Sequence, residues 1–328
     1  MRFCLALSLC VVAGAARAQD LERAQDASAA LIRDLAAVPA PNPVRKDAVS
    51  FYFVGHEDDW QLFMNPPAFK DVAATEDPAS PLREAVFVHL TAGDAGDGAE
   101  PNGDNPPYFK ARENGARAAI RFMADAQPGR TAVTSNESMV TLHGHRVFRV
   151  GYRGSAAYFL RLPDGDGSGN GYDSTGHQSL QRLEEGKISS MTAIDGSATY
   201  EGWADLVATL RALIDLERAG SGRVSLNVSD PDPAINPGDH PDHRASSQAA
   251  LEAAAGLRCA RRVLHQTYHV ADLPPNLGPE EDEMQAGVFA VTAAGVTALG
   301  SANTWEPHYK AWLGRGYART QEPADGCR

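Results

Sequence analysis

The stretch FYFVGHEDD, at residues 51–59, decides the fold. Its first half is apolar and aromatic without a charge, as expected for a strand buried on both faces, and it predicts a strand over residues 50–55. Its second half places one imidazole and three carboxylates directly after that strand. Because open α/β sheets bind ligands at the carboxyl ends of their strands, the stretch also predicts a site.

The segments on either side alternate between strands and helices. We predict buried strands at residues 85–90 and 223–228, and helices at residues 108–126, 200–217 and 246–255. This alternation is typical of an α/β fold with a mostly parallel sheet flanked by helices. Shorter alternating segments between residues 134 and 162 predict an antiparallel β edge added to that sheet.

The N-terminus has the features of a secretory leader. Arg2 precedes an apolar run at residues 3–13 that is too short to span a bilayer, and a small-x-small cleavage pattern ends at Ala18. We therefore predict a signal peptide over residues 1–18, a helix with a proline-rich linker over residues 19–49, and one catalytic domain over residues 50–328. The expected mature protein is secreted or periplasmic and has no transmembrane anchor.

The charge balance argues against a nucleic-acid partner. The chain has 30 basic and 42 acidic residues, a formal net charge of -12. Loss of the leader would remove two arginines and make the balance more acidic. A general nucleic-acid binder needs a basic face for phosphates, and this composition does not supply one.

Two cysteines remain after the leader is removed, Cys259 and Cys327. In an exported protein such a pair predicts a disulfide, here one that would tie the C-terminal tail to the body, with two free thiols as the alternative.

A second polar cluster, GDHPDHR at residues 238–244, follows another buried strand. Histidine and aspartate are donors that zinc accepts, and a catalytic zinc needs three protein ligands with one position left for water. His56, Asp59 and one histidine of the second cluster make up that number. Asp58 is then left over beside the ion, where a carboxylate can act as general base.

Each cluster also has a plain structural interpretation. The first could be a solvated acidic turn, and the second a loop whose polar residues cap a helix. The two together favour a metal site, because both follow buried strands and jointly supply a complete ligand set.

The two clusters resemble the signatures of a known family. Residues 55–59 resemble the A-H-P-D-D-E motif, and HPDH at residues 240–243 the H-x-D-H motif, of the PIG-L/LmbE-like zinc deacetylases. Residues 90–96, 108–113 and 160–165 resemble a secreted branch of that family in bacteria and fungi. The resemblance covers roughly residues 51–257, and it implies a Rossmann-like fold and removal of N-acetyl groups from sugars and glycoconjugates.

Carried over by position, the resemblance implies that His56, Asp59 and His243 bind Zn²⁺. Asp58 would be the general base, and His240 would stabilise the oxyanion or protonate the leaving amine. The carboxylate of Asp242 would orient and tune His240, a role that suits a carboxylate beside an imidazole.

Three further residues are expected in the substrate pocket. Arg112 matches an arginine that contacts sugar hydroxyls in the family. Trp60 stands where a glutamate is usual and is expected to change the pocket wall, while Glu57 stands where proline is usual. Asp94, after the second predicted strand, would either contact the sugar or cap the following turn.

These expectations define a secreted zinc-dependent N-deacetylase that acts on an N-acetylglucosamine-type sugar or glycoconjugate. Its chemistry would be attack by a water held on zinc and activated by Asp58. The alternative is a carbohydrate-binding protein of the same fold with a structural or decayed metal site. A serine hydrolase is disfavoured, because the chain has no G-x-S-x-G motif.

Three other patterns each have two interpretations. The glycine-rich residues 164–171 begin like a calcium loop, but Thr175 stands where a glutamate is needed, which favours a rim of the active site. HGH at residues 143–145 is either a hairpin turn, which we favour, or a metal site. The helical spacing of Trp305, Tyr309 and Trp312 favours a core stripe over a sugar-stacking platform.

Overall fold

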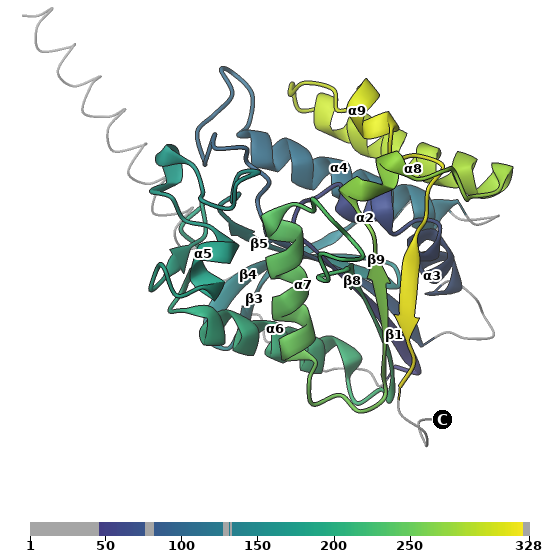
Figure 1. Ribbon diagram of the computed structural model, residues 1–328, viewed down its shortest axis with the longest axis horizontal. Coiled ribbons are helices and arrows are strands. Elements are labelled where there is room, and N and C mark those ends of the chain that lie inside the picture. The colour runs from purple at the N-terminus through teal and green to yellow at the C-terminus, as the bar shows by residue number, and fades with distance from the viewer. Residues whose placement is uncertain (1–45, 76–81, 127–130, 132, 324–328) are drawn as a thin grey trace, which may run out of the picture. The chain divides into compact units, whose positions relative to one another are not determined.

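The computed structural model describes residues 46–75, 82–126, 131 and 133–323 (Figure 1). The expected leader at residues 1–18, most of the expected helix and linker at residues 19–49, and Cys327 lie outside the described residues. Cys259 is disulfide-bonded, and the other three cysteines of the chain all lie outside the described part. None of the helices in the described ranges is both long enough and apolar enough to cross a membrane.

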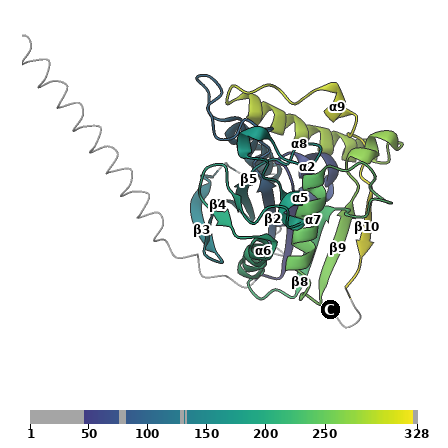
Figure 2. The ribbon, with the colours of Figure 1, turned by 60° about the vertical axis from the view of Figure 1, so that its left-hand side comes forward.

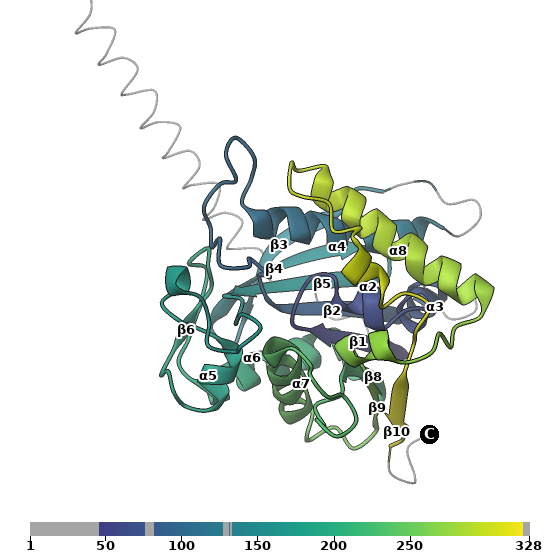
Figure 3. The ribbon, with the colours of Figure 1, turned by 45° about the horizontal axis from the view of Figure 1, so that its top comes forward.

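An eight-stranded sheet with the order β10-β9-β8-β1-β2-β5-β4-β3 forms the centre of the fold (Figures 1 and 3). Its five middle strands run parallel: β9 (Ala260–His265), β8 (Arg223–Ser229), β1 (Ala48–Val54), β2 (Arg83–Thr91) and β5 (Ser155–Leu162). The hairpin of β3 (Asn136–Leu142) and β4 (His145–Tyr152) adds antiparallel strands beyond β5. The predicted α/β fold, mostly parallel with an antiparallel edge, is therefore confirmed.

Two details of the sheet differ from the prediction. β5 was expected in the antiparallel edge, but it pairs in parallel with β2 and only its other side carries the antiparallel hairpin. The opposite edge ends in β10 (Ala318–Gln321), a short antiparallel strand on β9 that was not predicted. A separate small sheet joins β6 (Met191–Thr192) to β7 (Thr199–Tyr200).

Helices cover both faces of the sheet. On one face lie α5 (Leu180–Glu184), α6 (Trp203–Arg218) and α7 (Pro241–Ala253). On the other lie α2 (Asp59–Phe63), α3 (Pro67–Thr75), α4 (Tyr108–Asp125) and α8 (Pro279–Thr297), with the short α9 (Pro307–Lys310) beyond them (Figure 1). Two short 3₁₀ helices, Asp173–Thr175 and Tyr268–Asp272, complete the elements.

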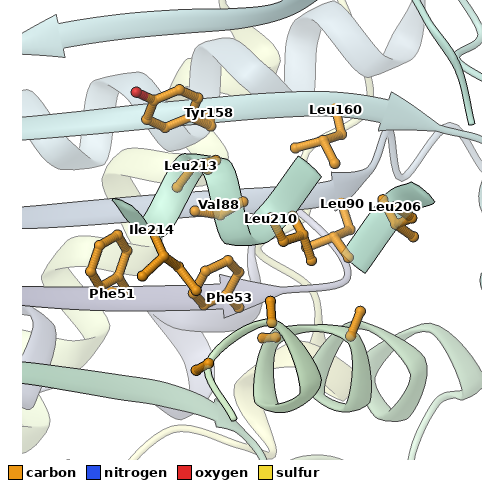
Figure 4. Packing of buried hydrophobic residues seen from close by; sticks show 14 of the residues in the cluster. Phe51, Phe53, Val88, Leu90, Tyr158, Leu160, Leu206, Leu210, Leu213 and Ile214 are labelled. Carbon is orange, nitrogen blue, oxygen red and sulfur yellow. The ribbon is translucent and has the colours of Figure 1, made fainter. Parts of the chain in front are cut away.

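The run FYFV has no polar alternation because both faces of β1 are covered. Phe51 and Phe53 pack into the layer of α6, together with residues of β2 and β5 (Figure 4). Tyr52 and Val54 point the other way, into the layer of α2, α3, α4 and α8. Each such side chain contributes about 1.5–3 kcal/mol of burial free energy, so the strand that carries the site is strongly fixed.

The start of α7 is the largest error in the predicted helices. The prediction began at residue 246, whereas the helix begins at Pro241, with His240 as the N-cap residue. The start signal was in the HPDH motif itself, because proline at the first helical position fits the helix and lacks only an N–H that would be unpaired there. His240, Asp242 and His243 therefore lie at the first turn of a helix.

The HGH segment is a hairpin turn, the first of the two interpretations given for its sequence. His143 and Gly144 both have positive φ, 48° and 90°, and join β3 to β4. Nε2 of His145 lies 2.9 Å from Oδ1 of Asp205, so this imidazole is paired with α6.

Candidate metal centre

The two polar clusters meet at the carboxyl end of the sheet, between β1 and β8. From β1 the chain continues to β2 on one side, while β8 pairs with β1 on the other; Figure 2 shows β8, β9 and β10 in turn on that side. This reversal of strand order is the point where open α/β sheets form a ligand crevice. The loop after β1 carries His56 and Asp58, and the loop after β8 leads to His240 and His243.

Three donor atoms of the predicted ligand set lie close together. Nδ1 of His56 is 3.1 Å from Nε2 of His243, which is 3.0 Å from Oδ1 of Asp59. Nδ1 of His56 and Oδ1 of Asp59 are 3.6 Å apart. Donors on a tetrahedral zinc with bonds of about 2.0–2.1 Å are separated by about 3.3 Å, so these spacings suit one ion.

Carboxylates lie near the far nitrogen of each imidazole, with a hydrogen bond at His243 and closer than 4 Å without one at His56. Nδ1 of His243 donates to Oδ1 of Asp239 at 2.7 Å, and the hydroxyl of Thr267 donates to the same oxygen. Nε2 of His56 faces Oδ2 of Asp242 at 3.4 Å and Oδ2 of Asp164 at 3.7 Å. Both imidazoles are thereby oriented so that their other nitrogens face Asp59, the arrangement found around metal-binding histidines.

The surroundings of these imidazoles favour positive charge. Burial disfavours the imidazolium of His243, but Asp59 and Asp239 outweigh burial and raise its pKa to about 10. Burial also opposes protonation of His56, and Asp59 and Asp242 nevertheless raise its pKa well above the usual range. A field that stabilises a proton between these groups also stabilises a metal cation there.

Two overlapping groups of donors, all buried except the half-buried His240, could hold an ion. One nitrogen each from His56, His240 and His243 lie within 4.8 Å of one another, as do single donor atoms of His56, Asp164, His240 and Asp242. The first group shares two histidines with the predicted set. Neither group includes Asp59, but its Oδ1 lies 3.0 Å from Nε2 of His243 and 3.6 Å from Nδ1 of His56, which suits the ligand set that the resemblance implied.

Asp58, the predicted base, lines the same cavity and is held by an arginine. Nη2 of Arg112 donates to Oδ1 of Asp58, and Nη1 donates to the carbonyl oxygen of Gly93 at 3.0 Å. The buried carboxyl of Glu57 lies 3.4 Å from Nε of Arg112, and burial raises the pKa of Glu57 to about 8. Arg112 was predicted to bind sugar hydroxyls, and the structure gives its guanidinium the further role of fixing Asp58.

His240 is oriented by a backbone group. Its Nδ1 accepts a hydrogen bond from the N–H of Asp242 at 3.1 Å, so the proton of the neutral ring is on Nε2. Burial, together with the neighbouring His56 and His243, lowers the pKa of His240 to about 2. A neutral imidazole can donate a hydrogen bond to an oxyanion, which is the first of the two roles that the resemblance implied.

The role predicted for the Asp242 carboxylate needs correction. Its Oδ2 lies 3.4 Å from Nε2 of His56 but 3.9 Å from Nδ1 of His240, and it accepts the backbone N–H of Gly165 at 2.8 Å. The carboxylate therefore lies nearer to His56 than to His240, and its hydrogen bond holds the loop after β5. The reason is helical geometry: at the N-cap, the ring of His240 turns toward the free N–H of Asp242.

Trp60 and Asp94 do not occupy the pocket wall. Trp60 is fully buried against Phe87, and its indole N–H donates to Nε2 of His89. Its helical position turns it into the core, so a direct substrate contact is not available to it. The Asp94 carboxylate accepts the backbone N–H groups of Asp164 and Gly98, which is the capping alternative.

Aromatic residues complete a small cavity of about 110 Å³ over the donors. Tyr268, from the segment after β9, and Tyr309 and Trp312, from the C-terminal segment, line it beside Asp58 and His240. Tyr268 and Trp312 stack with ring centroids 4.8 Å apart. All three aromatics of the predicted core stripe pack against the core cluster on this face of the sheet, and Tyr309 and Trp312 also line the cavity.

The glycine-rich segment after β5 contributes Asp164 to the same cavity. Asp166 is turned toward Ser168, whose hydroxyl and backbone N–H both donate to its Oδ2. This arrangement agrees with a rim of the site and not with a separate calcium loop.

Sequence reasoning missed Asp239, Thr267 and Tyr268. Asp239 stands four residues before His243, a spacing that predicts contact across the first turn of a helix beginning at Pro241. Thr267 and Tyr268 follow β9, a parallel strand that was not predicted, so no signal placed them at this edge.

Gly55 allows the two clusters to touch. A Cβ on this glycine would lie 3.1 Å from Cδ2 of His243 and 3.2 Å from the carbonyl carbon of Asp242. Such distances are tighter than most real Cβ contacts, so a side chain here would require the loop after β1 or α7 to shift slightly.

Comparisons with known proteins add little beyond this geometry. The chain matches no family model and no curated protein. Among solved structures it is similar to the N,N'-diacetylchitobiose deacetylase from Pyrococcus horikoshii complexed with its inhibitor MPG. The identity is 15%, the match covers 91% of this chain and 92% of that chain, and the TM-score is 0.42. The function is therefore argued from the site.

Proposed function

We propose that this protein is a zinc-dependent N-deacetylase of an N-acetylglucosamine-type sugar or glycoconjugate, exported by its N-terminal leader. The observation that carries the proposal is the spacing of 3.0–3.6 Å among donors of His56, Asp59 and His243, with a separate carboxylate, Asp58, on the same cavity. A structural metal site has no need of that additional carboxylate.

The donor set suits zinc. Two imidazole nitrogens and one carboxylate oxygen leave one tetrahedral position open, as in catalytic zinc sites. Bound there, zinc would supply Lewis acidity, polarising an amide carbonyl and acidifying water.

The chain's own residues would move the protons. Arg112 binds Oδ1 of Asp58, so Oδ2 is the oxygen that can take a proton from water. The Nε2–H of His240 can donate to the oxygen that becomes negative during attack on the amide. The cavity of about 110 Å³ is below the range of about 300–1,000 Å³ typical of whole small-molecule sites. It therefore fits an acetamide group, with the sugar ring held outside.

An Asp58→Asn variant tests the proposal. The purified chain is loaded with zinc, its metal content is measured, and acetate release is followed on N-acetylated mono- and oligosaccharides. We expect one zinc per chain in both proteins and turnover reduced about 10²- to 10⁴-fold in the variant.

Asp173→Asn is the matched control, because it makes the same isosteric change at a carboxylate that is 96% exposed. It should leave turnover unchanged. A different result would identify a binding protein instead. In that case zinc is bound, no N-acetylated sugar is turned over, and the wild type and Asp58→Asn bind sugar with equal affinity.

A further inference from the structure

The guanidinium of Arg112 has a partner at each of its three nitrogens. Nη2 donates to Oδ1 of Asp58, and Nη1 donates to the carbonyl oxygen of Gly93 at 3.0 Å. On the third side, Nε lies 3.4 Å from Oε2 of Glu57. Because a guanidinium is a rigid planar fork, partners at all three nitrogens fix both its place and its rotation.

The carboxyl group of Glu57 lies outside the metal cavity. Asp58 and Arg112 line the cavity, whereas Glu57 does not line it and is 1% exposed. Two consecutive residues of one loop therefore direct their carboxyl groups to different nitrogens of one guanidinium. Glu57 is thus placed to act on the cavity through Arg112.

Gly93 allows these two side chains to come together. Its φ is 50°, in the region that favours glycine. A Cβ on this residue would lie 2.6 Å from Nη1 of Arg112 and 2.6 Å from Oε2 of Glu57. Both groups therefore pack directly against the backbone at Gly93, and a larger residue there would displace them.

The loop after β1 has other contacts that hold its backbone. The carbonyl oxygen of Glu57 accepts a hydrogen bond from Nε2 of Gln61 at 2.7 Å, and the backbone N–H of His56 donates to Oδ2 of Asp59 at 2.8 Å. Oε2 of Glu57, in contrast, has no hydrogen-bond partner among the described residues. Burying such an oxygen costs free energy, and its ion pair with Arg112 is the interaction that offsets this cost.

We infer that Glu57 is a positioning residue for the proposed reaction. It holds Arg112 in the orientation in which the guanidinium binds Oδ1 of Asp58 and leaves Oδ2 to take a proton from water. This role rests on the proposed function. It is a feature of this chain and not of the motif that the loop resembles, in which proline is usual at the position of Glu57.

Kinetics of the zinc-loaded protein on an N-acetylated sugar test this role. We expect kcat to fall about 3-fold in Glu57→Gln, which keeps an oxygen near Nε, and about 10-fold in Glu57→Ala, as for a small misplacement of a catalytic group. KM should stay unchanged, because Glu57 does not line the cavity. An unchanged kcat would overturn the role. A rise in KM alone would also overturn it, because Arg112 would then be held for the substrate and not for Asp58.

Glu217→Gln is the matched control. Glu217 is likewise buried, at 4% exposed, and its Oε1 lies 2.9 Å from Nε of Arg149, but this pair lies near the other end of the sheet. Its substitution should leave both kcat and KM unchanged.

A double-mutant cycle tests whether Glu57 acts through Arg112. In the Arg112→Met background, Glu57→Ala should cause no further fall in kcat, because residues of one contact network do not contribute additively. An equal fall in both backgrounds would overturn the role, since Glu57 would then act by a route that does not include Arg112.

NMR of the zinc-free protein separates this role from the proposed function. The Nε–H signal of Arg112, identified by its loss in Arg112→Met, should show a rigid side chain in ¹⁵N relaxation of the wild type and of Glu217→Gln, and a mobile one in Glu57→Ala. If no sugar is deacetylated but the signal becomes mobile, the proposed function fails and the hold of Glu57 on Arg112 stands. A signal that stays equally rigid in Glu57→Ala contradicts the inference whatever the activity.

Discussion

The sheet has a charged cluster near each end, partly buried at the amino end and buried at the carboxyl end, and the two differ in how their charges are balanced. Near the amino end lies a paired cluster of two cations and two carboxylates: Lys46, Glu84, Arg149 and Glu217. At the carboxyl end the donor cluster has imidazoles facing carboxylates: His56, Asp59, Asp239, Asp242 and His243.

The paired cluster is complete within the chain. Nζ of Lys46 and Nε of Arg149 lie 3.0 and 2.9 Å from the oxygens of Glu217, and the hydroxyl of Tyr158 donates to the same carboxylate. The donor cluster instead has three carboxylates whose partners are imidazoles, which carry positive charge only when protonated. From this difference we propose that the first cluster stabilises the fold and that the second accepts either protons on its imidazoles or an added cation.

The largest expected effect is on metal binding at the donor cluster. Asp59→Ala removes one of three ligands, so the zinc affinity should fall by more than the about 10- to 100-fold typical of losing a residue that only supports a ligand. Competition with a chromogenic chelator measures it, with Glu217→Gln as the control that keeps wild-type affinity. Full affinity in Asp59→Ala would mean that His240 completes the ligand set instead.

The next effect is on stability, at the paired cluster. Glu217→Gln leaves Lys46 and Arg149 without their shared carboxylate, and the free energy of unfolding should fall by about 3 kcal/mol. Urea denaturation of the zinc-free protein measures it. Glu185→Gln, at a carboxylate 39% exposed and paired with Lys187, should change stability by less than about 1 kcal/mol. A similarly small effect of Glu217→Gln would show that the paired cluster does not stabilise the fold.

A smaller effect is expected where a carboxylate supports a ligand without binding the ion. Asp239→Asn weakens the hold on Nδ1 of His243 and should lower zinc affinity about 10- to 100-fold. Asp215→Asn, at a half-exposed carboxylate on α6, is the control and should leave zinc affinity unchanged. Wild-type zinc affinity in Asp239→Asn would show that Asp239 does not support the metal centre.

The smallest effect is the pH dependence of the paired cluster. Burial opposes ionisation of Glu217, but Arg149 and Lys46 outweigh burial and lower its pKa below the usual 4.5. A lowered pKa gives stability that is present above pH 4.5 and is lost as pH falls through the folded-state value. The stability difference between wild type and Glu217→Gln should therefore shrink from pH 7 to pH 3 in urea titrations, and a constant difference would contradict the assignment.

The sequence predicted those parts of the molecule that depend on local signals. The uncharged FYFV run predicted a strand buried on both faces, and the polar residues after it predicted a site at its end. The partners of His56 could not be predicted in the same way. Asp164 reaches it from the loop after β5, and their contact depends on the order of strands in the sheet.

Other errors had local physical causes. Trp60 was placed in the pocket wall because it stands where a glutamate is usual in the family that the sequence resembles, but its position in α2 directs it into the core instead. The carboxylate of Asp242 was assigned to the adjacent His240, whereas the N-cap geometry gives that role to the backbone N–H. In both cases the residue lies in the loop or helix start where the sequence placed it, but its side chain points in another direction than predicted.

The missing side chain of Gly55 has a consequence for assembly. The loops that meet there are separated by most of the domain, and they come into register only when β1 and β8 have paired. No proteolytic fragment that lacks either strand can therefore contain the complete ion-binding pocket. High-affinity zinc uptake would consequently report on the pairing of β1 with β8, and a methyl group at position 55 would require the loop after β1 and α7 to shift by about a few tenths of an ångström.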